Sequence, residues 1–168
     1  MNIPELNLEP FNFEYNQLDK NDFLRWNNDI FNLGFPYEYY YFKGNDLYRP
    51  WEDFSVIREQ LTNEWAEIVR QLEIMFANRE KQEIKPYLLK GIVLYISFMY
   101  WSNQVPVDLC GFPACLKELK GKPVNVEERL PFILARPYFY PSFMQLKSLM
   151  EEQIKIAAKM AALNKYKK

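Results

Sequence analysis

One long apolar stretch constrains this chain more than any other feature. Residues Pro86–Trp101 read PYLLKGIVLYISFMYW, and Ser97 is the one non-aromatic polar side chain between Ile92 and Trp101. Buried strands usually run about 4–8 residues, so the length of this stretch favours a helix. Wound at about 100° per residue, its apolar side chains cover nearly the whole circumference. Such a helix lies either in a protein core or in a membrane.

The length of the stretch decides between these two settings. A membrane-spanning helix needs about 20 apolar residues, because the hydrocarbon layer is about 30 Å thick. Lys90 interrupts the stretch, and Asn103 and Gln104 close it. About 15 helical residues reach only about 23 Å. We therefore predict that Pro86–Trp101 is the central core helix and that the protein does not enter a membrane.

Two further helices are predicted on either side of this stretch. The apolar residues of Trp51–Asn78 fall within an arc of about 120°, and those of Phe143–Asn164 within about 140°. Each helix therefore has one apolar face to bury, and a central helix that is apolar all round can serve both. The pattern predicts an all-α fold, a single-domain irregular helical bundle around the central hydrophobic helix, over residues 1–168.

Small residues near both ends of the central helix indicate how its neighbours approach. Gly91 and Ser102 lie on one line of this helix, with Tyr95 and Phe98 between them. A residue without a large side chain lets another backbone come close. We interpret this line as a contact with a neighbouring helix; a cleft beside the two aromatic rings is the alternative.

The first 50 residues are aromatic and irregular, in contrast to the helical core predicted over residues 51–168. A short helix is predicted at Asn21–Leu33, capped by Asp19 or Asn21. Residues Tyr37–Phe42 contain four tyrosines and fit either a strand or a loop. We interpret these tyrosines as rings that cover the core and leave their hydroxyls in water. A stacking or peptide-binding surface is the alternative.

Capping signals mark the helices of the C-terminal part. Asn125 followed by Glu128 matches the capping box, in which each side chain bonds to the backbone N–H of the other residue. Ser142 is the predicted cap of the last helix. The segment Arg136–Pro141 is predicted to be an extended linker, because Pro137 and Pro141 disfavour helix in the residues before them. A short helix is also expected at Pro113–Lys120.

The side-chain inventory limits the chemistry. The chain has no histidine and two cysteines, Cys110 and Cys115. Histidine is the commonest general base at neutral pH, and two thiols alone do not form a standard zinc site. We expect reduced cysteines, with a disulfide or redox pair as the alternative, and no catalytic residue, cofactor or metal. An enzyme that uses carboxylates such as Glu127 and Glu128 with Arg or Tyr remains a third hypothesis.

Charge is distributed unevenly although the net charge is −1. Residues 1–84 carry 16 acids and 8 bases, whereas residues 85–168 carry 6 acids and 13 bases. A basic half can bind nucleic acid, pack against the acidic half of the same chain, or associate with a second copy head to tail. Nucleic-acid binding through the basic C-terminal half is therefore the alternative function.

Residues Lys122–Leu130 and the segment after them resemble the YpoC-like family, small cytoplasmic proteins of Gram-positive bacteria. Beyond Lys122–Leu130, the resemblance rests on Pro137, Tyr140, Ser142, Phe143, Gln145 and Leu146. It covers about the C-terminal third of the chain. The resemblance implies an all-helical domain, and it carries no catalytic residue or cofactor over to this sequence.

The preferred functional hypothesis is a non-enzymatic interaction or accessory protein with an unknown protein partner. Arginine and tyrosine are favoured at the centres of protein interfaces. The candidate interaction surface therefore consists of Arg129, Arg136, Tyr138 and Tyr140. The N-terminus has no basic region followed by an apolar one, as a secretory signal would, and cysteines are few, so we expect a cytoplasmic location.

Overall fold

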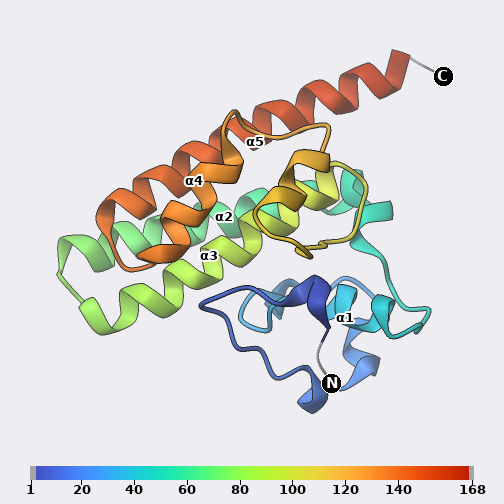
Figure 1. The fold of residues 1–168 in the computed structure, drawn as a ribbon, viewed down its shortest axis with the longest axis horizontal. Coiled ribbons are helices and arrows are strands. Elements are labelled where there is room, and N and C mark those ends of the chain that lie inside the picture. Colours follow the sequence, from blue (N-terminus) through green and yellow to red (C-terminus); the bar gives the residue numbers. More distant parts are fainter. Residues whose placement is uncertain (1–2, 167–168) are drawn as a thin grey trace.

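The computed structural model describes residues 3–166, and one buried helix forms its centre (Figure 1). Helix α3 spans Lys81–Ser102, and every residue from Gly91 to Ser102 is buried. It begins earlier than predicted, since Pro86 lies inside it and not at its start. A proline there removes one helical hydrogen bond, but this first part of the helix is largely exposed, so water can replace that bond. The helix therefore includes the charged residues Lys81, Glu83 and Lys85, which lie before the predicted start.

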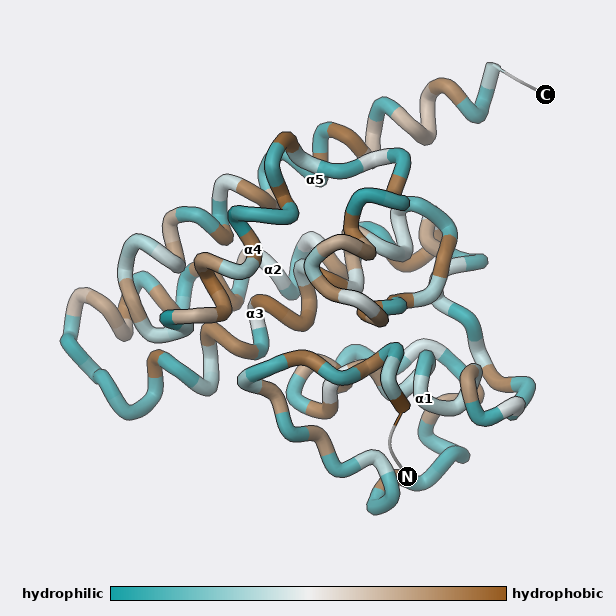
Figure 2. The backbone as a smooth tube through the Cα atoms, viewed as in Figure 1, coloured by the Kyte–Doolittle hydropathy of each residue, from teal (hydrophilic) through white to brown (hydrophobic). Residues whose placement is uncertain are grey.

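Two helices pack against α3, as the one-sided patterns predicted. Helix α2 spans Phe54–Ala77, helix α5 spans Tyr140–Tyr166, and both contact α3. A methyl group added at Gly91 would lie 3.3 Å from Cγ2 of Ile68 in α2 and 3.4 Å from Cδ2 of Leu146 in α5. The interpretation of Gly91 as a point of close helix packing is therefore confirmed. In Figure 2, hydrophobic residues dominate α3 after its hydrophilic first part.

Helix α4 completes the bundle. It spans Val126–Ala135 and packs along α5. The chain between α3 and α4 contains a 3₁₀ helix at Ala114–Glu118, which is shorter than the helix predicted at Pro113–Lys120. Residues 3–166 contain no β-strand, so the all-α prediction is confirmed. We call residues 54–166 the bundle.

Residues 3–53 lie against one side of the bundle, and we call them the N-terminal layer (Figure 1). The helix predicted at Asn21–Leu33 is wrong. Two 3₁₀ helices, Lys20–Phe23 and Asn28–Ile30, replace it. Asp19 and Asn27 begin them, and each side chain accepts a hydrogen bond from the backbone N–H two residues later. Such local bonds compete with a regular helix.

Helix α1 spans Pro36–Phe42, where either a strand or a loop was predicted. Proline suits the first position of a helix, because its fixed φ is helical and its missing N–H is not needed there. Tyr37 and Tyr40 are buried as expected, but their hydroxyls are not left in water. The Tyr37 hydroxyl donates to the carbonyl of Arg25 at 2.7 Å, and that of Tyr40 donates to the carbonyl of Leu18 at 3.2 Å.

A short irregularity joins the N-terminal layer to the bundle. The helix predicted to begin at Trp51 begins at Phe54, and residues Pro50–Glu52 form a separate 3₁₀ helix. Asp53 breaks the two apart with φ −128° and ψ 22°. Trp51 is buried nonetheless. It shares the apolar face that predicted the helix, although it lies outside α2.

Candidate functional site

The structure separates the four residues of the predicted interaction surface into two groups. Arg129 lies in α4 and acts as a clamp onto α5. Its guanidinium donates to Oε2 of Glu152 at 2.6 Å, to the Ser148 hydroxyl at 3.2 Å and to Oε1 of Gln145 at 3.3 Å. It also donates to the carbonyl of Val124 at 3.1 Å. With its donors occupied inside the protein, Arg129 is a structural residue of the bundle.

The other three residues lie together in the turn between α4 and α5, and we call Arg136–Tyr140 the aromatic turn. Tyr138, Phe139 and Tyr140 are 50%, 40% and 53% exposed. The Arg136 guanidinium lies over the Phe139 ring, 5.1 Å from its centroid. The rings of Tyr138 and Phe139 meet edge to face at 5.8 Å. Three adjacent aromatic side chains and an arginine therefore face solvent in one place.

The aromatic turn packs against the bundle through ring contacts. The Tyr140 ring meets Phe76 of α2 edge to face at 5.3 Å, and Phe76 in turn stacks on Phe143 at 5.4 Å. The backbone N–H of Phe139 donates to the carbonyl of Arg136 at 3.2 Å, which closes a turn. The prediction of an extended linker is therefore wrong, because this bond closes a turn around Pro137 and Pro141 already lies in α5.

The predicted capping roles are only partly correct. Asn125 does precede the first residue of α4, but its side chain makes no capping bond. Its backbone is left-handed, with φ 59°, a conformation that asparagine tolerates better than most residues. The Glu128 carboxylate forms no hydrogen bond or ion pair with any described residue, so the reciprocal capping box is absent. Ser142 is a buried residue inside α5, which begins at Tyr140, and is not its cap.

The prediction missed a buried carboxylate in the N-terminal layer, Glu38 of α1. Its side chain is 0% exposed. Oε2 accepts hydrogen bonds from the indole Nε1 of Trp101 at 2.7 Å and from the backbone N–H of Val107 at 3.1 Å. Oε1 has no partner among residues 3–166. Burial raises the pKa of Glu38 to about 7, and the two donated hydrogen bonds oppose this rise.

Glu38 joins three segments that are distant in the sequence. It belongs to α1, whereas Trp101 closes α3 and Val107 lies in the loop after it. The Trp101 ring also meets Trp26 edge to face at 5.8 Å. A sequence signal for this site exists, because Glu38 is the single acid within the aromatic run Tyr37–Phe42. If the neighbouring aromatic side chains are buried, an acidic residue between them must either be buried with them or interrupt the buried segment.

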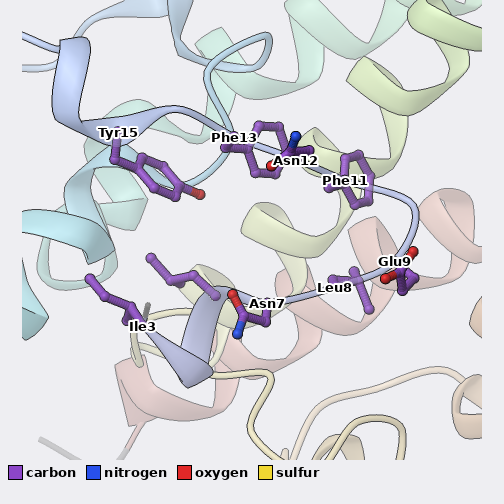
Figure 3. A pocket seen from close by; sticks show the side chains of 9 residues that line it. Ile3, Asn7, Leu8, Glu9, Phe11, Asn12, Phe13 and Tyr15 are labelled. Atoms are coloured by element: carbon purple, nitrogen blue, oxygen red, sulfur yellow. The ribbon is translucent and has the colours of Figure 1, made fainter. Parts of the chain in front are cut away.

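Several hollows adjoin the N-terminal layer. The first measures about 440 Å³ and lies inside the bend of residues 3–15 (Figure 3). In that view the rings of Tyr15, Phe13 and Phe11 lie along one side of the hollow, and Ile3, Asn7 and Leu8 lie along the other. The Tyr15 hydroxyl accepts from the backbone N–H of Phe35, and burial raises its pKa. This hydroxyl therefore helps to hold the layer together.

The second hollow measures about 600 Å³ and separates the N-terminal layer from α4. Its walls come from residues 4–10, 109–112 and 131–135. Cys110 lies at its edge as a free, exposed thiol, and Cys115 is also a free thiol. Burial raises the pKa of Cys115, so its thiol stays protonated at neutral pH and is a weak nucleophile. The structure thus agrees with two reduced cysteines.

Ion pairs account for part of the charge asymmetry. Lys90 of α3 pairs with Glu64 of α2 at 3.3 Å, and Lys147 of α5 pairs with Glu73 of α2 at 3.2 Å. Each pair joins a base of the second half of the chain to an acid of the first half. Packing of the two halves against each other therefore explains part of the uneven charge distribution.

Comparison with known proteins finds a family match that lies within the bundle. A family model described as YpoC-like protein matches residues 56–165. The chain belongs to the YpoC-like family. A relative from Bacillus subtilis (strain 168), called "Uncharacterized protein YpoC", is 32% identical over 117 residues, which cover 69% of this chain and 71% of the relative. No solved structure matches the chain.

The YpoC-like match begins inside α2 and ends inside α5, so the family unit coincides with the bundle. It includes the aromatic turn and Arg129, and it leaves Glu38 outside. Within residues 3–166, no helix is long and apolar enough to cross a membrane. Over the same residues, acidic and sulfur side chains do not gather in threes in a way that could hold a metal ion.

Proposed function

We propose that this YpoC-like protein is a non-enzymatic accessory module that binds a partner protein through the aromatic turn. The observation that carries the proposal is the exposure of Tyr138, Phe139 and Tyr140 beside Arg136. Contiguous exposed apolar surface is typical of interaction sites. Tyrosine and arginine are also the residues that most often dominate binding energy at an interface.

Neighbouring side chains enlarge this surface. Phe132 and Met144 are 49% and 43% exposed. Phe132 precedes Arg136 by four residues in α4, and Met144 follows Tyr140 by four residues in α5. Residues spaced by four lie on the same side of a helix, so Met144 extends the surface along α5. Phe132 lies in the last turn of α4, directly before the aromatic turn. A partner would therefore meet an apolar centre with a single arginine.

The rigidity of the aromatic turn further supports this role. Its backbone is closed by the bond from Phe139 to Arg136, and the Tyr140 ring rests on Phe76. Pro137 is buried, which fixes the turn from the inside. Binding through groups that are already ordered costs less conformational entropy than binding through mobile ones. The exposed rings are thus already ordered before a partner binds.

The test is capture of partners from native cells with the tagged protein, followed by measurement of the affinity for the purified partner. Arg136→Ala and Tyr138→Ala are each expected to weaken that affinity more than about fivefold, as truncation of a central interface residue does. Tyr166→Ala is the matched control, because this tyrosine is 88% exposed at the opposite end of α5. Its affinity is expected to equal that of the wild type.

Two results would contradict the proposal. One is that no protein is retained by the wild type more than by the Arg136→Ala variant. The other is that Tyr138→Ala and Tyr166→Ala weaken binding equally. Circular dichroism melts of all variants provide the control for folding, since the altered side chains are exposed and their loss leaves the core intact.

A further inference from the structure

The C-terminal part of α5 carries a second surface. Residues Ala161–Tyr166 are all exposed, and Figure 1 shows this end of α5 projecting beyond the rest of the bundle. Lysines lie on α5 just before this projection and on the loop that packs beside it. We call four of them the lysine surface: Lys120, Lys122, Lys155 and Lys159.

Gly121 brings the two pairs of lysines together. The amide of Gln153 in α5 donates to the Gly121 carbonyl at 3.1 Å. A methyl group added at Gly121 would lie 3.0 Å from Cγ2 of Ile156 and would collide with Met160. Lys120 and Lys122 flank this glycine in the sequence, and Lys155 and Lys159 directly precede Ile156 and Met160. The contact at Gly121 therefore brings together the two segments of the chain that carry these four lysines.

No ion pair among residues 3–166 involves these four lysines. Lys120, Lys155 and Lys159 are exposed, and none of them pairs with a carboxylate of residues 3–166. The Lys122 ammonium donates to the carbonyls of Leu119 at 2.7 Å and Lys117 at 3.2 Å, which fixes its position without cancelling its charge. Other bases of the second half, such as Lys90 and Lys147, do have acidic partners.

The helix dipole does not explain the lysine surface. Lysines stabilise the C-terminal end of a helix, but this effect falls off within the last turn. It accounts for Lys165, whereas Lys155 and Lys159 lie about three and two turns before Tyr166. Nor do these lysines take part in packing, since both are exposed. Their charge is therefore available to a ligand.

We infer that the lysine surface binds nucleic acid through its phosphates. Lysines that contact successive phosphates give binding that does not depend on base sequence. Tyr166, which is 88% exposed beyond the lysines, offers a ring on which a base can stack. A membrane surface fits less well, because an interfacial helix needs a broad apolar face and this end of α5 presents Leu163 among alanines. The surface is separate from the aromatic turn.

The experiment measures the fluorescence anisotropy of labelled 20-nucleotide single-stranded and duplex DNA with the full-length protein. If four phosphates are contacted, the affinity should fall about 100-fold between 50 and 200 mM salt. The double variant Lys155→Glu/Lys159→Glu is expected to lose at least about tenfold in affinity at 50 mM salt, because it replaces two attractive charges with repulsive ones.

A matched control separates the surface from overall charge. Lys81→Glu/Lys85→Glu changes the same residue type at the same spacing, and both lysines are exposed near the start of α3. Its DNA affinity is expected to stay within about threefold of the wild type. The inference is overturned if the wild type does not bind DNA at 50 mM salt or if both double variants lose affinity equally.

A third arm tests the alternative ligand. Vesicles with 30% phosphatidylserine are offered to the same three proteins in a sedimentation assay. Binding to vesicles that depends on Lys155 and Lys159, without binding to DNA, would overturn the inference in favour of a membrane surface. The protein-partner proposal is tested independently, since Arg136 and Tyr138 are unchanged in both double variants.

Discussion

The bundle and the N-terminal layer bury their apolar residues in different ways. The bundle consists of helices such as α2 and α3, which satisfy their own backbone groups and need only a partner for their apolar faces. The layer consists of short 3₁₀ helices and the seven-residue α1. In the layer, side chains must satisfy much of the backbone, and aromatic rings fill the space between the turns.

This difference shows in the hydrogen bonds. In the layer, the side chains of Asp19, Asn27, Tyr37 and Tyr40 all bond to backbone groups. Glu38 does the same at the boundary with the bundle. The helices of the bundle pack through apolar faces that recur regularly along the sequence. The layer is stabilised by individual side-chain contacts. The YpoC-like family match covers the part that depends on periodicity.

The largest expected effect tests whether α3 is the centre of the bundle. Leu94 is 0% exposed in α3. Leu94→Ala should lower the free energy of unfolding by about 2–5 kcal/mol, because it leaves a cavity in a packed core. Urea denaturation followed by circular dichroism measures the change. Leu24→Ala is the control in the layer; Leu24 is 55% exposed, so its loss should cost less than about 0.5 kcal/mol.

A cost below about 0.5 kcal/mol for Leu94→Ala would break the comparison, because the central helix would then contribute no more than an exposed side chain of the layer. An equal decrease in the free energy of unfolding for Leu94→Ala and Leu24→Ala would have the same meaning. The expected ratio between the two variants is therefore as informative as either value.

The second effect concerns Glu38 and is a dependence on pH. Burial raises its pKa from 4.5 to about 7, so the folded protein binds this proton more tightly than the unfolded chain does. The stabilisation is therefore complete below pH 4.5 and is lost as the pH rises to 7. A shift of this size corresponds to about 3 kcal/mol between pH 4.5 and pH 8.

The matched variant is Glu38→Gln, which keeps a carbonyl oxygen for Trp101 and Val107 but cannot ionise. Urea denaturation of both proteins at pH 5 and pH 8 gives the change in the free energy of unfolding. The wild type should lose more stability than the variant, while all other titrating groups cancel in the difference. Equal pH dependence in the two proteins would show that Glu38 does not hold a proton at the boundary between layer and bundle.

The smallest effect tests a single bond of the layer. Tyr37→Phe removes a hydroxyl that donates to the Arg25 carbonyl and accepts from the Asn27 N–H at 2.8 Å. The cost should be about 1–2 kcal/mol, since two partly buried backbone groups lose their partner. Tyr41→Phe is the control, because Tyr41 is exposed and its hydroxyl bonds to no described residue; its cost should be below about 0.5 kcal/mol. Equal urea midpoints for both variants would contradict the prediction.

The bundle could be predicted from the sequence because its helices bury one face or nearly all faces. The apolar arcs located α2, α3 and α5 to within a few residues, and their all-α arrangement followed. The boundaries were less accurate. Pro86 is not a helix start, because a proline is tolerated within the exposed first part of a helix, and Ser142 is not a cap, because it lies inside α5.

The layer could not be predicted because nothing in it is periodic. Asp19 and Asn27 bond to the backbone locally and divide the predicted helix into two short 3₁₀ helices. Glu38 finds its donors in Trp101 and Val107, more than 60 residues away, and no local pattern indicates that pairing. In the candidate site, residue type suggested the surface, but it did not distinguish the bonded Arg129 from the exposed Arg136.

The pairing of Glu38 has a consequence for the order of events during synthesis. The layer leaves the ribosome first, yet the donors of its buried carboxylate are made only at the end of α3 and in the loop after it. The carbonyl of Glu5 likewise waits for the N–H of Leu109, to which it is bonded at 2.7 Å. Although N-terminal segments usually fold first during translation, these first residues cannot reach their final state early. A nascent chain that stops before residue 109 should therefore expose the aromatic rings of its N-terminal part to chaperones.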